Sequence, residues 1–303
     1  MKILITGSSG LVGRTLVPRL RDLGHEVLRL VRREARADDE RSWDPARGEL
    51  DESALAVDAV IHLAGESIAE GRWNEARKAR IRDSRVDGTR LLSEAIARAA
   101  TPPQVFVSAS AVGFYGEAGD RVVDEQSAAG TGFLSEVCQA WEAATEVVDR
   151  ARTRVVNVRI GVILSPDGGA LAKMLTPFRL GVAGRIGSGR QWMSWISLTD
   201  VVSTLLQAVE DDALSGPVNA VAPHPVTNLE FTRTLGRVLS RPTVMPMPAF
   251  AARMAFGQMA DELLLSSLRV RPTALMRSDF TFRHPDLETA LRELLSRPSV
   301  RAA

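Results

Sequence analysis

Lysine, tyrosine and cysteine, three residues with versatile proton and redox chemistry, are scarce in this chain of 303 residues. Lysine occurs only at Lys2, Lys78 and Lys173, tyrosine only at Tyr115 and cysteine only at Cys138. A single cysteine excludes an intramolecular disulfide and fits a reducing compartment, so we expect a cytoplasmic protein. The few lysines and the single tyrosine also restrict any chemistry that needs a tyrosine beside a lysine.

The chain also lacks long apolar runs, a strong net charge and spaced metal ligands. No run of about 18 apolar residues is present, so we expect no membrane span. The formal net charge is only +1, so no global field attracts nucleic acid or anionic lipid, and any basic function must be local. The four histidines show no metal-ligand spacing. We therefore expect a small-molecule substrate, no metal, and neither a nucleic-acid nor a membrane partner.

What the chain does contain is an alternation of short apolar segments with helical patterns. The segment 2–6 is typical of a parallel strand buried on both faces, and a helical spacing of leucines and valines follows it. This alternation predicts an α/β fold with a doubly wound parallel sheet of the Rossmann type. The expected strands cover 2–6, 26–31, a segment ending near 43, 59–63, 105–108 and 155–160, and the longer helices cover 73–99 and 132–150.

A glycine-rich turn joins the first predicted strand to the first predicted helix. Gly7 makes the tight turn, Gly10 lets the backbone approach a pyrophosphate, and Gly13 permits close packing of the helix on the sheet. The helix N-terminus then offers free N–H groups to the phosphates. Glycine triads also occur in ordinary turns, so the signal depends on this position in the chain. The predicted dinucleotide loop comprises Gly7, Ser9, Gly10, Leu11, Val12 and Gly13.

Arg32 directly follows the second predicted strand. Enzymes that prefer NAD usually have an acidic residue at this point for the ribose hydroxyls, whereas an arginine suits the 2′-phosphate of NADP. The alternative is a solvated surface arginine in an arginine-rich chain. We interpret Arg32 as a phosphate ligand and expect NADP(H) as the cofactor.

Two further cofactor contacts rest on position along the chain. Asp44 lies just past the third predicted strand, where its carboxylate would accept a hydrogen bond from the adenine amino group. Leu63, Ala64 and Gly65 follow the fourth strand and would bring small residues against the adenosine ribose. A turn aspartate and a strand-end glycine are the alternative interpretations.

The second half of the chain differs in composition. Residues 165–195 are rich in glycine and hold two tryptophans, which favours site-building loops over sheet. Residues 242–248 carry three prolines and are typical of an extended connector, and 249–295 show a mainly helical pattern. We expect an NADP-binding Rossmann core at 1–164, substrate-side segments interleaved with the last sheet strands at 165–241, and a small helical carboxy-terminal domain at 242–303.

Several separated motifs resemble the extended branch of the short-chain dehydrogenase/reductase superfamily. More closely, the chain is similar to the atypical "epimerase family protein" group, which carries a carboxy-terminal domain of unknown function. The resemblance covers nearly the whole length and implies an extended Rossmann fold. It also adds Glu66, Arg85 and Ser108 to the expected cofactor-binding residues. The matching segments are 6–13, 58–66, 72–73, 84–86, 108–116, 141–142, 187–193, 257–260, 262–265 and 280–285.

The chain departs from that superfamily at its catalytic residues. Catalysis there normally uses a serine and a Tyr-x-x-x-Lys pair, whose ammonium lowers the pKa of the phenol. The residue four positions after Tyr115 is Gly119, and the aligned helix has Cys138 and Glu142 at the tyrosine and lysine positions. A carboxylate beside a thiol disfavours the thiolate, so Cys138 is no simple replacement base. Ser110 alone keeps the place of a carbonyl-binding hydroxyl.

Two functional interpretations follow from this departure. In the first, the protein is an enzyme in which Ser110 holds a carbonyl or hydroxyl group, Glu142 or Tyr115 handles the proton, and Cys138 contributes a hydrogen bond. A missing general acid typically lowers a rate about 10²–10⁴-fold without abolishing it. In the second, the protein is an NADPH-binding regulator or scaffold that has lost catalysis. Fold alone does not decide between them.

The predicted substrate pocket lies near the tryptophans of the glycine-rich segment. Arg190 would pair with an anionic group, and Trp192 or Trp195 would stack on a ring or a sugar face. The alternative is a glycine-rich turn with a packed tryptophan.

Overall fold

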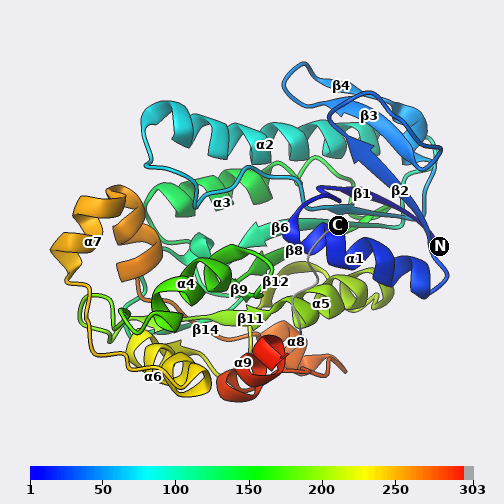
Figure 1. Cartoon of the computed structure of the whole chain (residues 1–303). Helices are drawn as coiled ribbons and strands as arrows, with labels where there is room; N and C mark the ends of the chain where they lie inside the picture. The colour runs from blue at the N-terminus through cyan, green and yellow to red at the C-terminus, as the bar shows by residue number, and fades with distance from the viewer. Residues whose placement is uncertain (297–303) are drawn as a thin grey trace.

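The computed structural model describes residues 1–296 and centres on an eight-stranded sheet (Figure 1). The last seven residues of the predicted carboxy-terminal domain, 297–303, lie outside the described part. Every neighbouring pair in the sheet is parallel except the edge pair of β3 and β4. The strands, in their order across the sheet, are β12 (Gly216–Ala220), β8 (Arg154–Ile160), β6 (Val105–Ala111), β5 (Ala59–His62), β1 (Lys2–Thr6), β2 (Glu26–Val31), β3 (Glu40–Asp44) and β4 (Glu49–Leu50).

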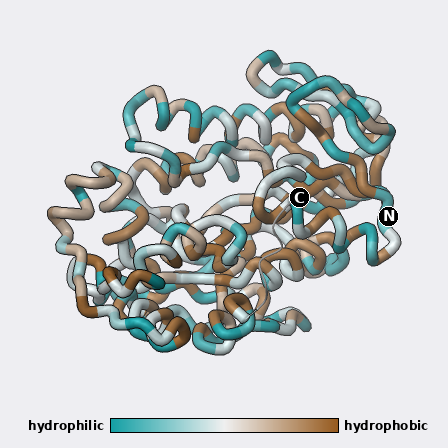
Figure 2. The backbone as a smooth tube through the Cα atoms, viewed as in Figure 1, coloured by the Kyte–Doolittle hydropathy of each residue, from teal (hydrophilic) through white to brown (hydrophobic). Residues whose placement is uncertain are grey.

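Helices cover both faces of this sheet, so its central strands are buried on both sides. The helices α1 (Leu11–Asp22) and α5 (Leu198–Glu210) lie on one face, and α2 (Glu75–Arg98) and α3 (Phe133–Ala143) lie on the other (Figure 1). In β1, Ile3 and Ile5 enter the core beneath α1 and α5, whereas Leu4 enters the core beneath α2. The apolar strands therefore carry the brown of hydrophobic residues in Figure 2, as expected for a doubly wound sheet.

Beyond β8 the chain builds a smaller unit beside the carboxyl ends of the central strands. A separate apolar core, which includes the fully buried Trp195, holds much of it together. A small parallel pair, Val122–Val123 with Arg269–Val270, ties this unit back to the segment after β6. Its elements are β9 (Val162–Leu164), α4 (Gly169–Arg179), β10 (Trp192–Met193), β11 (Trp195–Ser197), β13 (Val226–Thr227), α6 (Asn228–Leu239), α7 (Ala249–Phe256), a π-helix (Ala260–Leu265), β14 (Arg269–Val270), α8 (Thr273–Arg277) and α9 (Leu287–Ser296).

The fold class predicted from the sequence is confirmed, and the differences fall at particular elements. Helix α4 occupies part of the segment that we expected to be loops, because flanking glycines hide the helical spacing of Leu171, Leu175 and Phe178. Helix α3 ends at Ala143 rather than near residue 150, and the Thr145 hydroxyl then donates to the Glu142 carbonyl. Strand β12 lies within 165–241, where the last sheet strands were expected, but its bounds were not predicted. Within residues 1–296, no helix is both long and apolar enough to cross a membrane.

Candidate cofactor and catalytic site

The glycine loop lies at the carboxyl end of β1, and two of its positions require glycine. Gly7 has a φ of +68°, and a Cβ there would stand 2.7 Å from the Leu63 carbonyl carbon. A Cβ on Gly13 would stand 2.3 Å from the Gly7 carbonyl oxygen, so α1 can pack on the turn only without a side chain. Gly10 precedes α1 and provides no side-chain cap. The first N–H groups of α1 are thus left for a ligand, and the backbone cradle fits a dinucleotide pyrophosphate.

Thr6 connects this loop to the neighbouring strand β5. Its hydroxyl oxygen accepts hydrogen bonds from the Leu63 and Ala64 amides, each at 3.1 Å, and lies 2.7 Å from His62 Nδ1. Because both lone pairs are engaged, Thr6 donates to Nδ1 and the ring carries its proton on Nε2. Burial lowers the pKa of His62 to about 3, so the ring is neutral. The contact holds Leu63, Ala64 and Gly7 together where the sequence predicts the cofactor.

The two arginines after β2 have different surroundings. Arg33 donates to both carboxylate oxygens of Glu40, at 2.8 and 2.6 Å, and this pairing lowers the pKa of Glu40 to about 2. Arg32 is exposed and makes no hydrogen bond or ion pair within residues 1–296. Arg33 is therefore anchored to the protein, whereas Arg32 is left with a free guanidinium.

Asp44, which the sequence predicts as an adenine ligand, ends β3 and caps the following turn by accepting from the Ala46 amide at 3.0 Å.

The side chain of Arg85, a second basic group, packs against Gly65. A Cβ on Gly65 would stand 3.3 Å from the guanidinium carbon of Arg85, which lies 5.1 Å from the centre of the Trp141 ring. Burial lowers the pKa of Arg85 below its ordinary value. The Glu66 amide donates to Ser84 at 3.0 Å, and its carboxylate pairs with Arg77. Ser108 is buried within β6.

Three residues at the end of β6, on α3 and on β8 form an internal ion-paired cluster. Ser110 Oγ donates to Glu142 Oε1 at 2.6 Å, and Arg159 donates to both oxygens of that carboxylate, from Nε at 2.8 Å and from Nη2 at 2.7 Å. Ser110 and Arg159 are register partners on adjacent strands, so both side chains lie beneath α3. Burial alone would lower the pKa of Arg159, but Glu142 outweighs it and the pKa is raised. The pair is therefore ionised, and only Ser110 can be the donor in its bond to Glu142.

Arg159 extends the cluster to Tyr115. Its Nη1 donates to the phenol oxygen at 3.0 Å, and that hydroxyl donates to Asn219 Oδ1 at 2.8 Å. The guanidinium also lies 3.5 Å from the centre of the Phe114 ring, a close cation–π contact. Burial raises the pKa of Tyr115 to about 12. The phenol is thus a fixed, neutral member of the network.

Cys138 lies beside this cluster on α3 but is a poor nucleophile or base. Its side chain is buried, and burial, followed by the nearby Glu142 carboxylate, raises the pKa of the thiol to about 12. Arg85 opposes that effect without cancelling it. The expected suppression of the thiolate therefore agrees with the environment of Cys138.

The structure brings together Ser110, Tyr115, Cys138 and Glu142, and it adds a residue that the sequence analysis missed. Arg159 joins Glu142 to Tyr115. A signal was present, because Asn157 and Arg159 alternate with valines inside a buried strand, and a charged residue in such a place needs a partner.

The predicted substrate residues do not share one environment. Arg190 is exposed, and the Trp192 indole donates to Asp120 at 3.1 Å while Arg269 stacks on its ring at 4.2 Å. Trp195 is fully buried, and its indole donates to the His224 carbonyl at 3.1 Å. In this structure Trp195 therefore packs in the core and has no surface for a ligand, which agrees with the alternative interpretation of a packed tryptophan.

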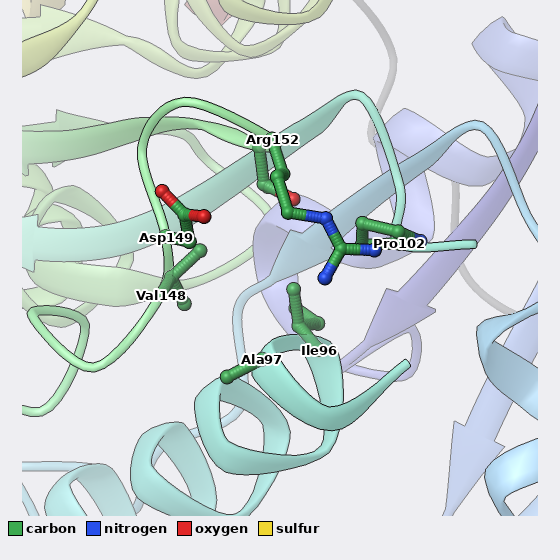
Figure 3. A pocket seen from close by; sticks show the side chains of 7 residues that line it. Ile96, Ala97, Pro102, Val148, Asp149 and Arg152 are labelled. Carbon is green, nitrogen blue, oxygen red and sulfur yellow. The ribbon is translucent and has the colours of Figure 1, made fainter. Parts of the chain in front are cut away.

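Two hollows lie away from this cluster. The first, near Ile96, Asp149 and Arg152 (Figure 3), is at the opposite sheet edge from Ser110 and holds no space for a ligand. The Arg152 guanidinium lines this hollow and donates hydrogen bonds to the carbonyls of Ala99 and Ala100. The second is a groove of about 710 Å³ between the outer faces of α2 and α3. The part of the chain described here contains no group of three or more acidic, histidine or cysteine side chains that could hold a metal ion.

Known proteins match this chain over nearly its whole length. The model of the NAD dependent epimerase/dehydratase family matches residues 3–221, and a domain of unknown function, DUF1731, matches residues 247–294. An epimerase family protein of Mycobacterium bovis is 48% identical over 98% of both chains, and the mouse epimerase family protein SDR39U1 is 38% identical over 98% of this chain and all of that protein.

Solved structures give the same assignment. Human SDR39U1 (isoform 2), crystallised with NADPH, superposes with a TM-score of 0.91 at 35% identity, covering 98% of this chain and 100% of that one. A nucleoside-diphosphate sugar epimerase of Corynebacterium glutamicum gives 0.80 at 39% identity, covering 97% of this chain and 58% of that one. The chain thus belongs to the NAD-dependent epimerase/dehydratase family of extended short-chain dehydrogenases/reductases, in the group with the DUF1731 carboxy-terminal domain.

Proposed function

We propose that the protein is an NADP(H)-dependent oxidoreductase or epimerase-like enzyme that acts on a small carbonyl, hydroxyl or sugar-like compound. The observation that carries the proposal is the position of Ser110. It lies near the carboxyl end of β6, at the same sheet edge as the glycine loop. There it donates to Glu142, which also accepts from Arg159. We also place this activity in the cytoplasm, because the single cysteine forms no disulfide within the chain.

The preference for NADP(H) rests on Arg32. Its exposed guanidinium lacks an acidic partner within the described residues, whereas Arg33 next to it is anchored to Glu40. A free guanidinium beside the end of β2 suits the 2′-phosphate, which a neutral ribose hydroxyl cannot match electrostatically. The crystallised relative with NADPH supports the same choice.

The proton chemistry would pass through Ser110. When bound, the nicotinamide exchanges a hydride with the substrate carbon, so the protein needs to handle only one proton. Ser110 already donates its own hydrogen to Glu142, so its free lone pairs can accept a hydrogen bond from a substrate hydroxyl. The substrate proton would pass to Ser110 as the serine proton passes to Glu142. Arg159 holds the Glu142 carboxylate in place through two hydrogen bonds.

A second candidate function is an NADPH-binding regulatory or scaffold protein without turnover. It is favoured by the burial of the catalytic candidates: Ser110 is 3%, Tyr115 2%, Cys138 4% and Arg159 4% exposed. Their polar groups also bond to one another. Under this function the ion-paired cluster is a structural replacement for the lost acid–base pair.

Two measurements separate these candidates. NADPH should raise the melting temperature far more than NADH does, and Arg32→Ala should remove that difference; equal shifts in the wild type would contradict the cofactor assignment. A panel of carbonyl compounds, followed through NADPH absorbance, should then reveal turnover that falls about 10²-fold or more in Ser110→Ala. NADPH binding without turnover on any compound would favour the regulatory function, and unchanged turnover in Ser110→Ala would remove that residue from the mechanism.

A further inference from the structure

Exposed large apolar side chains are concentrated at one end of the molecule. Of the twelve such residues in the described chain, seven fall between positions 180 and 254. Single exposed apolar residues are ordinary, but a contiguous group marks an interaction surface. We call six of them the apolar tip: Leu180 (71% exposed), Val182 (51%), Val244 (76%), Met245 (56%), Phe250 (67%) and Met254 (72%).

Backbone contacts bring together the two chain segments that carry the apolar tip, although they are distant in sequence. The segment after α4 runs beside the proline-rich connector, where the Met245 amide donates to the Ala183 carbonyl at 3.4 Å and the Met247 amide to the Arg185 carbonyl at 2.9 Å. Helix α7 follows directly and presents Phe250 and Met254 one turn apart. It lies at the far left of the molecule in Figure 1, and its tube in Figure 2 carries mainly apolar colours.

The chain segments that carry the apolar tip contain basic residues but no acidic ones. No aspartate or glutamate occurs in residues 168–199 or 231–260, and each of these segments contains four basic residues. Arg179 and Arg185 adjoin the tip and are exposed. Three carboxylates lie nearby. Asp261 is paired with Arg253 at 2.8 Å, Glu262 accepts from the Leu134 amide and from Gln258, each at 2.8 Å, and Glu70 lies in the loop that contacts α4 and α7. The net charge of +1 therefore conceals a local basic surface.

We infer that the apolar tip is a docking surface for an anionic lipid bilayer. Its arginines would pair with lipid phosphates while its apolar side chains enter the interface. Each tip residue is more than half exposed. Such protruding side chains can insert into the apolar part of a bilayer, and they do not line a groove that could hold a peptide. Two copies of a surface on which arginines outnumber carboxylates would repel each other, which disfavours self-association. The inference revises the sequence-based expectation of no membrane partner and does not depend on the proposed catalysis.

The test is cosedimentation of the full chain with vesicles. Vesicles of equal parts phosphatidylcholine and phosphatidylglycerol should bind the wild type in low salt, whereas pure phosphatidylcholine vesicles should bind it much less. The pair Arg179→Gln and Arg185→Gln should weaken binding about fivefold per arginine, and Phe250→Ser with Met254→Ser should weaken it at least as much. Each variant should keep the NADPH-induced melting shift, which shows that it is folded.

Val147→Ser with Met276→Ser is the matched control, because both residues are exposed apolar side chains outside the apolar tip. Binding of this control should equal that of the wild type. The inference is overturned if anionic vesicles do not bind the wild type, or if the control and the tip variants bind alike. It is also overturned if light scattering shows a dimer that Phe250→Ser with Met254→Ser dissociates, since the tip would then be a contact between copies.

Discussion

The cofactor half of the site and its catalytic half are built in different ways. The cofactor half, around β1, α1 and the end of β5, depends on backbone shape: two of its glycines stand where a Cβ would collide with backbone atoms. The catalytic half, around β6, α3 and β8, depends on side chains, and most of the usual ones are replaced. Backbone geometry tolerates little change once a dinucleotide must fit, whereas side chains on the same scaffold can be exchanged as a set.

That exchange is internally consistent. Glutamate in place of lysine introduces a negative charge beneath α3, and Arg159 on β8 neutralises it with two hydrogen bonds. Tyr115 then accepts a hydrogen bond from the third guanidinium nitrogen, Nη1, and donates to Asn219. A buried carboxylate without such a partner would be strongly destabilising. The replacement of lysine by Glu142 therefore depends on Arg159.

The largest expected effect comes from breaking this pair. Glu142→Ala leaves the Arg159 guanidinium buried and unpaired, and should lower the free energy of unfolding by about 3–5 kcal/mol. Chemical denaturation followed by circular dichroism would measure it. The double variant Glu142→Leu with Arg159→Met should recover much of the loss, because it removes both charges. A loss in Glu142→Ala of less than about 1 kcal/mol, the value typical of exposed pairs, would contradict a buried, coupled pair.

The cofactor half can be broken through Gly13. Gly13→Ala would place a Cβ 2.3 Å from the Gly7 carbonyl oxygen, and the resulting overpacking should lower the free energy of unfolding by about 3 kcal/mol. The NADPH-induced melting shift should disappear, because the loop no longer holds its shape. Gly24→Ala is the control: its φ is +82° but no atom lies within 4 Å of the added Cβ, so the melting shift should survive. A normal NADPH response in Gly13→Ala would show that the loop does not hold the cofactor.

The smallest expected effect is the reactivity of the Cys138 thiol in the folded protein, which tests whether solvent reaches the catalytic half. With its pKa raised to about 12 by burial, the thiol should react with iodoacetamide at pH 8 only as fast as the protein unfolds. Labelling measured by mass spectrometry should therefore accelerate sharply in denaturant. Rapid labelling of the native protein would show that the cluster is open to solvent.

The same contrast explains what could be predicted from the sequence. The sheet, the glycine loop and the loss of the Tyr-x-x-x-Lys pair depend on local patterns, and the fold was predicted correctly. The ion pair between Arg159 and Glu142 could not be predicted from local patterns, because the two residues lie 17 positions apart on different elements. Ser110 joins them only because the register of β6 with β8 places it beside Arg159. Helix α4 and the burial of Trp195 depend on packing in the smaller unit, where glycines obscure the periodicity.

The most direct test of this account measures cofactor affinity and turnover on one variant, Glu142→Gln, which keeps the shape of the side chain and removes its charge. The NADPH dissociation constant, from calorimetry, should stay within about twofold of the wild type, because backbone groups around α1 hold the cofactor. Turnover of the compound found in the carbonyl panel should fall about 10²-fold, because Ser110 loses its proton acceptor. An unchanged rate, or an affinity that falls in parallel with the rate, would contradict the separation of the two halves.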